Sequence, residues 1–540
     1  MKNYFKIFTL MAAALLSLSS CGLLDSKEDL ELTDEMLETR YYHYRNMGIR
    51  AYSFLPDGFS RLDGNLFATV SDEAQYYTSL SDAARFNNGS WNQFYNPDDQ
   101  FDRLYVGIHD CNYFLENTGD YEERLALHRD TVTIDGNASY KQDVKDLERL
   151  RHEAIVMRSY YYFELLKRYG DIPMMKTSTS TTYTERVAYQ DVVNQIVKDI
   201  DEVKNKLVLN WVEESLSNND GRLTLGAANA LKSRILLYAA SPLNNPDGSV
   251  EKWEKAAAAA HDVIAMSRYY LSDSYRDLFL TSATNTDPEV IWAVRHQADN
   301  ELEQLNYPIG TQGGGTGVCP SHNLVKAYEP GDPRLKATIV ANNDMWNGRK
   351  MEIYAGGTDD PAKANTSVTG YYLKKFLQSD LNLVSDATEI HSWILFRYAE
   401  ILLNFAEAMN EAYGPDAKGI FSMSAREAVN AVRARTSVNM PAVTATSKEE
   451  MRAAIRRERQ VELAFEEHRW WDLLRWKEAE TVLNSPIYGV VNTMGANGDF
   501  TTEEKVVASR KFDGTKMYRY PIPQTEVVRT GNSIVQNPNW

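Results

Sequence analysis

Residues 455–476 read IRRERQVELAFEEHRWWDLLRW, the most distinctive stretch of this chain. Glu458, Glu462 and Glu466 lie four residues apart, so on one helix they form a column of like charges that opposes an isolated helix. The residues that can pair with these acids, or with each other, are Arg459, Arg469, Asp472 and Arg475. We therefore expect paired charges and tryptophans that lock two helices together. A catalytic role for the carboxylates is the alternative.

Helical periodicity extends on both sides of this stretch. It predicts helical repeats over about 100–266 and 394–480, including single helices over 394–411 and 448–479. Alanines recur where helices would cross, which is typical of tetratricopeptide packing, although no strict repeat is visible. The pattern predicts a mainly α protein, a tetratricopeptide-like helical repeat scaffold with little β structure.

Three loop-rich insertions interrupt the helices, at about 55–100, 267–392 and 484–520. The second contains a strand-like run, 289–294, and a glycine run, 310–317. The glycine run lacks the GK[ST] ending of a phosphate loop, so we expect a mobile or close-packed loop. Because loops on a rigid scaffold often carry function, we expect these insertions to hold the ligand site.

The first twenty residues have the features of a secretory signal peptide. Lys2 and Lys6 precede an apolar run that ends at Ser19-Ser20-Cys21. This ending resembles a bacterial lipobox, which predicts cleavage before Cys21 and acylation of its sulfur. Residues 21–36 then form an acidic tether, and residues 37–540 form a single domain. The mature protein is predicted to be held to a membrane by its lipid anchor only.

Charge and cysteine content exclude several classes of function. The formal net charge is -17, so binding to nucleic acid is not expected. Three cysteines provide no zinc motif, and we expect no cofactor. Asp98-Asp99 and Asp359-Asp360 could hold calcium, with ordinary acidic loops as the alternative. Asp72-Glu73 is a poor glycosidase pair because adjacent side chains point apart.

Several segments resemble, in order, the pattern of the SusD/RagB family of outer-membrane lipoproteins from Bacteroidetes. The segments are 151–173 (RHEAIVMRSYYYFELLKRYGDIP), 221–238 (GRLTLGAANALKSRILLY), 396–408 (FRYAEILLNFAEA), 455–476, 520–523 (YPIP) and 536–540 (QNPNW). The match spans nearly the whole mature chain.

This resemblance implies a surface-exposed lipoprotein of the outer membrane that binds its ligand without catalysis. It also implies a partner, a SusC-like TonB-dependent outer-membrane transporter, to which captured oligosaccharides are delivered. Some family members handle peptides, so peptide capture is the first alternative. A secreted helical glycoside hydrolase is the second.

The aromatic content, 11% of residues, favours sugar binding because sugar C–H faces pack on flat rings while hydroxyl groups need polar partners. Candidate ligand residues in the polar loops are Trp91, Trp346, Tyr95, Asn88, Arg85, Tyr76, Tyr307 and Tyr354. We assign Trp292, Trp470, Trp471 and Trp476 to the core instead.

Overall fold

The computed structural model describes residues 40–179, 185–211, 214, 221–280 and 287–540. The predicted signal peptide, Cys21 and the tether lie outside these residues. The chain divides into two compact units: unit 1 contains Asn117–Glu148 and the residues up to Met47, and unit 2 contains Gly48–Glu116 and Arg149–Trp540. No helix within the described ranges is long and apolar enough to span a bilayer.

The described part of unit 1 contains three helices. They are α6 (Tyr121–Ala126) and the N-terminal parts of α3 (Tyr41–Arg50) and α7 (Ile134–Tyr169). Tyr41 on α3 donates a hydrogen bond of 2.7 Å to Asp146 on α7. Tyr140 on α7 donates to the backbone oxygen of Glu122 on α6, at 3.1 Å. These contacts fasten both shorter helices to α7.

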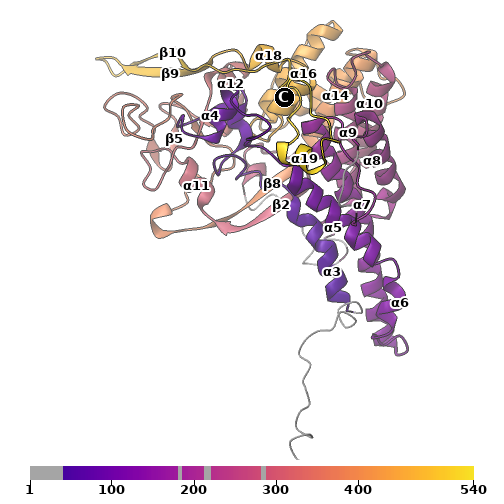
Figure 1. Cartoon of the computed structure of the whole chain (residues 1–540). Helices are drawn as coiled ribbons and strands as arrows, with labels where there is room; N and C mark the ends of the chain where they lie inside the picture. Colours follow the sequence, from indigo (N-terminus) through magenta and orange to yellow (C-terminus); the bar gives the residue numbers. More distant parts are fainter. Residues whose placement is uncertain (1–39, 180–184, 212–213, 215–220, 281–286) are drawn as a thin grey trace, which may run out of the picture. The chain divides into compact units, whose positions relative to one another are not determined.

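Unit 2 is rich in helices, which confirms the predicted fold class (Figure 1). Its longer helices are α5 (Phe101–Asn117), the remainder of α7, α8 (Tyr189–Val203), α9 (Leu225–Ala240), α10 (Val250–Ala265), α14 (Tyr398–Tyr413), α15 (Ala425–Arg433) and α16 (Lys448–Glu462). Helix α9 packs against α8, α10 and α14, and α14 packs in turn against α10, α15 and α16. The buried alanines of α9 and α10 permit these close crossings.

Shorter helices occupy the remaining segments of unit 2. The α-helices are α4 (Asp82–Asn87), α11 (Glu301–Asn306), α12 (His322–Ala327), α13 (Pro333–Thr338), α17 (Arg469–Arg475), α18 (Ala479–Val482) and α19 (Gln524–Arg529). The 3₁₀ helices are η1 (Ala51–Phe54), η2 (Phe67–Val70), η3 (Lys204–Lys206), η4 (Asp277–Phe279) and η5 (Leu383–Ser385).

The strands form small antiparallel sheets of two strands each. The pairs are β1 (Ala74–Tyr76) with β3 (Val318–Pro320), β2 (Val290–Asp299) with β8 (Glu389–Arg397), β4 (Ile339–Val340) with β7 (Tyr372–Leu373), β5 (Met345–Trp346) with β6 (Arg349–Lys350), and β9 (Ile487–Met494) with β10 (Phe500–Ala508). Strand β2 confirms the strand predicted at 289–294.

Two predictions about helix boundaries are wrong. Residues 394–397 belong to strand β8, which pairs with β2, and the predicted helix begins only at Tyr398. The helix predicted for 448–479 is interrupted twice. Phe465 (φ 65°) and Glu467 (φ 64°) adopt left-handed backbone conformations between α16 and α17, and Lys477 (φ 59°) does so between α17 and α18, which begins at Ala479. Residues 484–520, which were predicted to be loop-rich, also contain the β9–β10 hairpin, which is drawn as a long ribbon in Figure 1.

Two predictions about packing are confirmed. The four tryptophans assigned to the core, Trp292, Trp470, Trp471 and Trp476, are all buried. The glycine run is close-packed: a Cβ atom at Gly314 would lie 2.6 Å from the backbone oxygen of Pro308, and one at Gly315 would lie 2.6 Å from that of Gln304 in α11. These glycines therefore permit close approach of two backbone segments.

Candidate functional site

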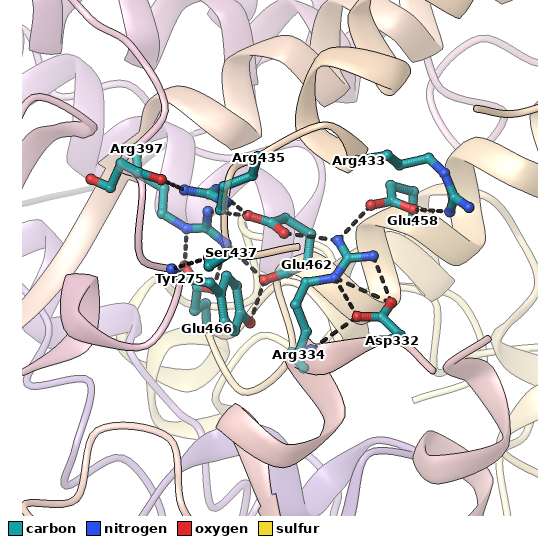
Figure 2. Close-up of polar contacts among 12 residues, drawn as sticks. Tyr275, Asp332, Arg334, Arg397, Arg433, Arg435, Ser437, Glu458, Glu462 and Glu466 are labelled. Carbon is teal, nitrogen blue, oxygen red and sulfur yellow. Dashed lines mark hydrogen bonds and ion pairs between the residues drawn. The ribbon is translucent and has the colours of Figure 1, made fainter. Parts of the chain in front are cut away.

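The column of glutamates lies in a buried ionic network (Figure 2). Glu462, at the end of α16, is fully buried and accepts hydrogen bonds from three arginines of other segments. The distances to its carboxylate oxygens are 2.9 Å from Arg334, 2.7 Å from Arg397 and 2.7 Å from Arg435. Burial alone would raise the pKa of Glu462, but these cations hold it well below its usual value.

The neighbouring glutamates complete the network. Glu458 accepts from Arg334 at 2.5 Å and from Arg433 at 2.8 Å. Glu466, in the turn after α16, accepts from Arg397 and from Lys375, both at 2.7 Å. Since Glu466 is outside the helix, the three carboxylates do not form one helical column.

The network is structural. Each of its acids and bases is buried and already paired, so no carboxylate is free to exchange a proton with a substrate. The charges are paired, as predicted, but they join more than the two helices expected: α16 is linked to α13, α15, β8 and the segment after α15. None of the three glutamates is exposed, so the network does not support the alternative of a catalytic role.

A second set of paired side chains involves the polar residues along α14. Four polar residues of this helix each bind an arginine: Glu400 with Arg234, Asn404 with Arg459, Glu407 with Arg475 and Glu411 with Arg452. Asp72 is likewise bound by Arg469, at 2.7 Å and 2.9 Å. Its neighbour Glu73 is buried, and the pKa of Glu73 is raised to about 8, mainly by loss of solvation and then by the charge of Asp72. Asp72 lines a hollow beside α16 but is paired with Arg469, and Glu73 is buried, so neither residue is an exposed free acid.

The acidic pairs considered for calcium are engaged by protein groups. Asp98 accepts hydrogen bonds from Arg61 and Arg168, and Asp359 accepts two from Arg349. No group of three or more metal-ligating side chains gathers anywhere in the described part of the chain.

Three of the predicted ligand residues are buried, which corrects the expectation that they are open loop aromatics. Trp91, Trp346 and Tyr307 are each no more than 1% exposed. Trp91 stacks on Phe86, with ring centroids 4.8 Å apart, and the C-terminal Trp540 lies against it at 4.8 Å. Tyr307 and Trp346 pack edge to face at 5.2 Å. Their faces are covered by protein, so they offer no stacking platform.

The other predicted residues of the first insertion gather around α4. We name Tyr76, Arg85, Asn88, Phe94 and Tyr95 the α4 surface. Tyr95 is 42% exposed and Phe94 is 75% exposed, and the Arg85 guanidinium lies 4.9 Å from the centre of the Tyr95 ring. Phe94 was not among the predicted ligand residues, although it lies in the same polar stretch as Tyr95.

Hydrogen bonds hold the α4 surface in place. The Tyr95 hydroxyl donates to Asp82 at 2.5 Å, and this bond raises the pKa of Tyr95. The Asp63 carboxylate accepts from the backbone N–H groups of Asp82 and Ala83, at 2.7 Å and 2.9 Å, and so caps α4. The surface therefore presents aromatic faces beside an exposed guanidinium and a carboxylate, the groups that suit sugar rings and their hydroxyls.

The two remaining residues of the α4 surface complete its polar edge. The Tyr76 hydroxyl lies 3.5 Å from the backbone oxygen of Asp63, and the exposed Asn88 accepts from the Ser90 N–H at 2.9 Å. Tyr354, in contrast, packs against the β9–β10 hairpin, with its ring 5.0 Å from that of Phe500. The structure thus brings Tyr76, Arg85, Asn88 and Tyr95 together around α4, and it places Tyr354 against the hairpin instead.

Two hollows of about 670 Å³ and 690 Å³ flank α16. Arg452 and Arg456 line both of them. Arg452 is paired with Glu411 and Arg456 with Glu478, and Arg469 in the second hollow is paired with Asp72. These walls are charged, and neither hollow includes a predicted ligand residue.

Comparison with known proteins gives matches over most of the chain. Residues 288–540 match the model described as the SusD family, and residues 24–237 match the model described as "Starch-binding associating with outer membrane". A SusD-like protein of Formosa agariphila, P38, is 26% identical over 370 residues, which are 63% of this chain and 68% of that protein.

Solved structures show the same fold. A SusD-like protein from Bacteroides fragilis is 24% identical, and the superposition covers 94% of this chain and 99% of that one with a TM-score of 0.76. A laminarin-binding SusD-like protein is 21% identical, with 92% and 99% covered and a TM-score of 0.65.

Proposed function

This chain belongs to the SusD/RagB family, and on that premise we propose that it captures oligosaccharides at the α4 surface. The observation that carries the proposal is the exposed pair Phe94 and Tyr95, set beside Arg85 and Asp82. Two neighbouring exposed aromatic side chains offer a contiguous apolar surface on which a ligand can pack. A sugar ring can stack on it while its hydroxyl groups bind the charged neighbours.

The place of action follows from the N-terminal sequence. Acylation of Cys21 anchors the mature chain to the outer membrane, and the matched family description includes association with that membrane. The captured oligosaccharide then passes to a SusC-like TonB-dependent transporter. A binding protein on the outer face needs such a partner because its ligand is too polar to cross the bilayer unaided.

Glycan binding is tested by calorimetry with purified protein and a panel of oligosaccharides that includes starch- and laminarin-derived chains. We expect Tyr95→Ala to weaken binding of the active glycan about tenfold, from the loss of about 1.4 kcal/mol of stacking. Tyr270→Ala, which removes a tyrosine that is 62% exposed elsewhere in unit 2, is the matched control.

Two results would contradict the proposal. If Tyr95→Ala and Tyr270→Ala bound the glycan equally well, the α4 surface would not be the binding site. If peptides tested alongside the panel bound to the protein and no oligosaccharide did, the proposed ligand class would be wrong. Delivery is tested separately, by co-purification of the lipidated protein with an outer-membrane transporter from its native membrane.

A further inference from the structure

The loop between α6 and α7 carries an exposed apolar tip. We define the apolar tip as Leu127, Val132 and Ile134, whose side chains are 74%, 91% and 89% exposed. All residues from Leu127 to Asp135 are exposed, so no part of the described chain covers this loop. Three aliphatic side chains this open within one short loop indicate a surface that another body covers.

The loop is held in a defined conformation. The Asp130 carboxylate accepts hydrogen bonds of 2.9 Å from the backbone N–H groups of both Val132 and Thr133. Arg129 is ion-paired with Asp143 on α7. Because these polar groups fix the backbone, the apolar side chains are held outward.

The tip lies at the end of unit 1 at which α3 begins. Tyr41, in the first turn of α3, bonds to Asp146, and Gly48 packs beside Leu150, so α3 and α7 run in the same direction. Twelve residues separate Ile134 from Asp146, so at about 1.5 Å per residue α7 extends about 18 Å beyond the start of α3. Figure 1 shows the start of α3 and the α6–α7 loop toward the same end of this unit.

We propose that the apolar tip inserts into the outer leaflet of the membrane that holds the lipid anchor. This inference rests on the anchor at Cys21 in the proposed function. Twenty residues separate Cys21 from Tyr41, and at about 3.5 Å per residue they span up to about 70 Å, ample for the tip to reach the bilayer. The acyl chains hold the protein, and the tip sets how unit 1 stands on the membrane.

The chemistry of the tip points to lipid tails. The residues around it are not basic: Asp130 and Asp135 outnumber Arg129. Attraction to anionic headgroups therefore contributes little, and burial of aliphatic surface is the driving force. Insertion is accordingly insensitive to salt, unlike an electrostatic contact.

The test uses the full lipidated chain in vesicles of phosphatidylethanolamine and phosphatidylglycerol. A nitroxide is attached at Val132→Cys, and depth is measured from its accessibility to oxygen and to an aqueous nickel reagent. Cys111 and Cys319 are buried thiols with raised pKa values and escape labelling. Ile420→Cys, at an aliphatic position that is 90% exposed in unit 2, is the matched control.

We expect the label at position 132 to be at least fivefold less accessible to the nickel reagent than the label at 420, equally at low and high salt. Serine replacements at Leu127 and Ile134 should remove this protection while oligosaccharide binding is unchanged. Equal accessibility at 132 and 420 would overturn the inference, as would protection that needs a co-reconstituted transporter, which would indicate a protein contact.

The outcome is separable from that of the glycan experiment. Mass spectrometry that finds Cys21 without acyl chains would overturn this inference together with its premise. If no oligosaccharide binds and the label at 132 is still protected, the membrane contact stands and the glycan proposal falls.

Discussion

Replacing Glu462 by glutamine tests whether the buried network stabilises the fold. The substitution keeps the size of the side chain and removes the charge that faces Arg334, Arg397 and Arg435. Breaking a buried ion pair from one side costs about 3–5 kcal/mol. Each arginine keeps another carboxylate, such as Glu289 for Arg435, so we expect a loss near the lower end, about 3 kcal/mol.

The pH dependence of this loss provides a second signature. The pKa of Glu462 is lower in the folded chain than its ordinary value of 4.5, so its contribution to stability is present above pH 4.5 and is lost as pH falls toward the folded pKa. The difference between the wild type and Glu462→Gln should therefore be constant from pH 5 to 7. Below pH 4.5 it should shrink by about 1.4 kcal/mol per pH unit.

Urea unfolding followed by circular dichroism at pH 7, 5 and 3.5 measures both effects. Glu504→Gln is the control, because Glu504 pairs with Lys326 at 2.5 Å on the surface, where such a pair contributes about 0–1 kcal/mol. A loss for Glu462→Gln within 1 kcal/mol of that control, or one that does not shrink in acid, would refute the structural role assigned to the network.

Three further predictions concern buried side chains. Trp91→Ala should lower the free energy of unfolding by about 3–5 kcal/mol, since the ring is packed between Phe86 and Trp540; an unchanged thermal midpoint would contradict its burial. Burial raises the pKa of Glu73 to about 8, so the wild type loses stability as pH rises from 4.5 to 8. The free energy of unfolding of Glu73→Gln, measured in urea, should therefore rise relative to that of the wild type by about 1.4 kcal/mol per pH unit over this range. A difference that does not change with pH would disprove the raised pKa. Burial also raises the pKa of Cys111 to about 12 and that of Cys319 to about 11, so a charged thiol reagent should modify them only after unfolding; reaction in the native state would show that they are accessible.

Local periodicity was enough to predict the helical scaffold, but it failed where an apolar run is short and continuous. Residues 393–396, Trp-Ile-Leu-Phe, suit a buried strand and a buried helix equally, and only their pairing with β2 makes them a strand. The β9–β10 hairpin was missed because β10 has no buried side chain, which leaves no clean alternation of apolar and polar residues.

The sequence was enough to predict the segment that forms the candidate site, but not which aromatic side chains within it are exposed. Trp91 and Tyr95 stand four residues apart in the same polar stretch, so the sequence around them does not separate a core ring from an exposed one. Tyr520 and Trp540, which cover Trp91, lie more than four hundred residues further along the chain. Tyr95 has no such cover, and its hydroxyl finds a local partner in Asp82.

The spacing of the partners of Glu462 along the chain has a consequence for the order of folding. Arg334, Arg397 and Arg435 all precede it, by 128, 65 and 27 residues. Until the segment around residue 462 is available, these three cations lack the one carboxylate that they all share, and contacts of such long range form slowly. A nascent or truncated chain that stops short of this point therefore cannot complete its core. The chain therefore becomes able to fold only once the segment around residue 462, which lies in the last fifth of the polypeptide, has been synthesised.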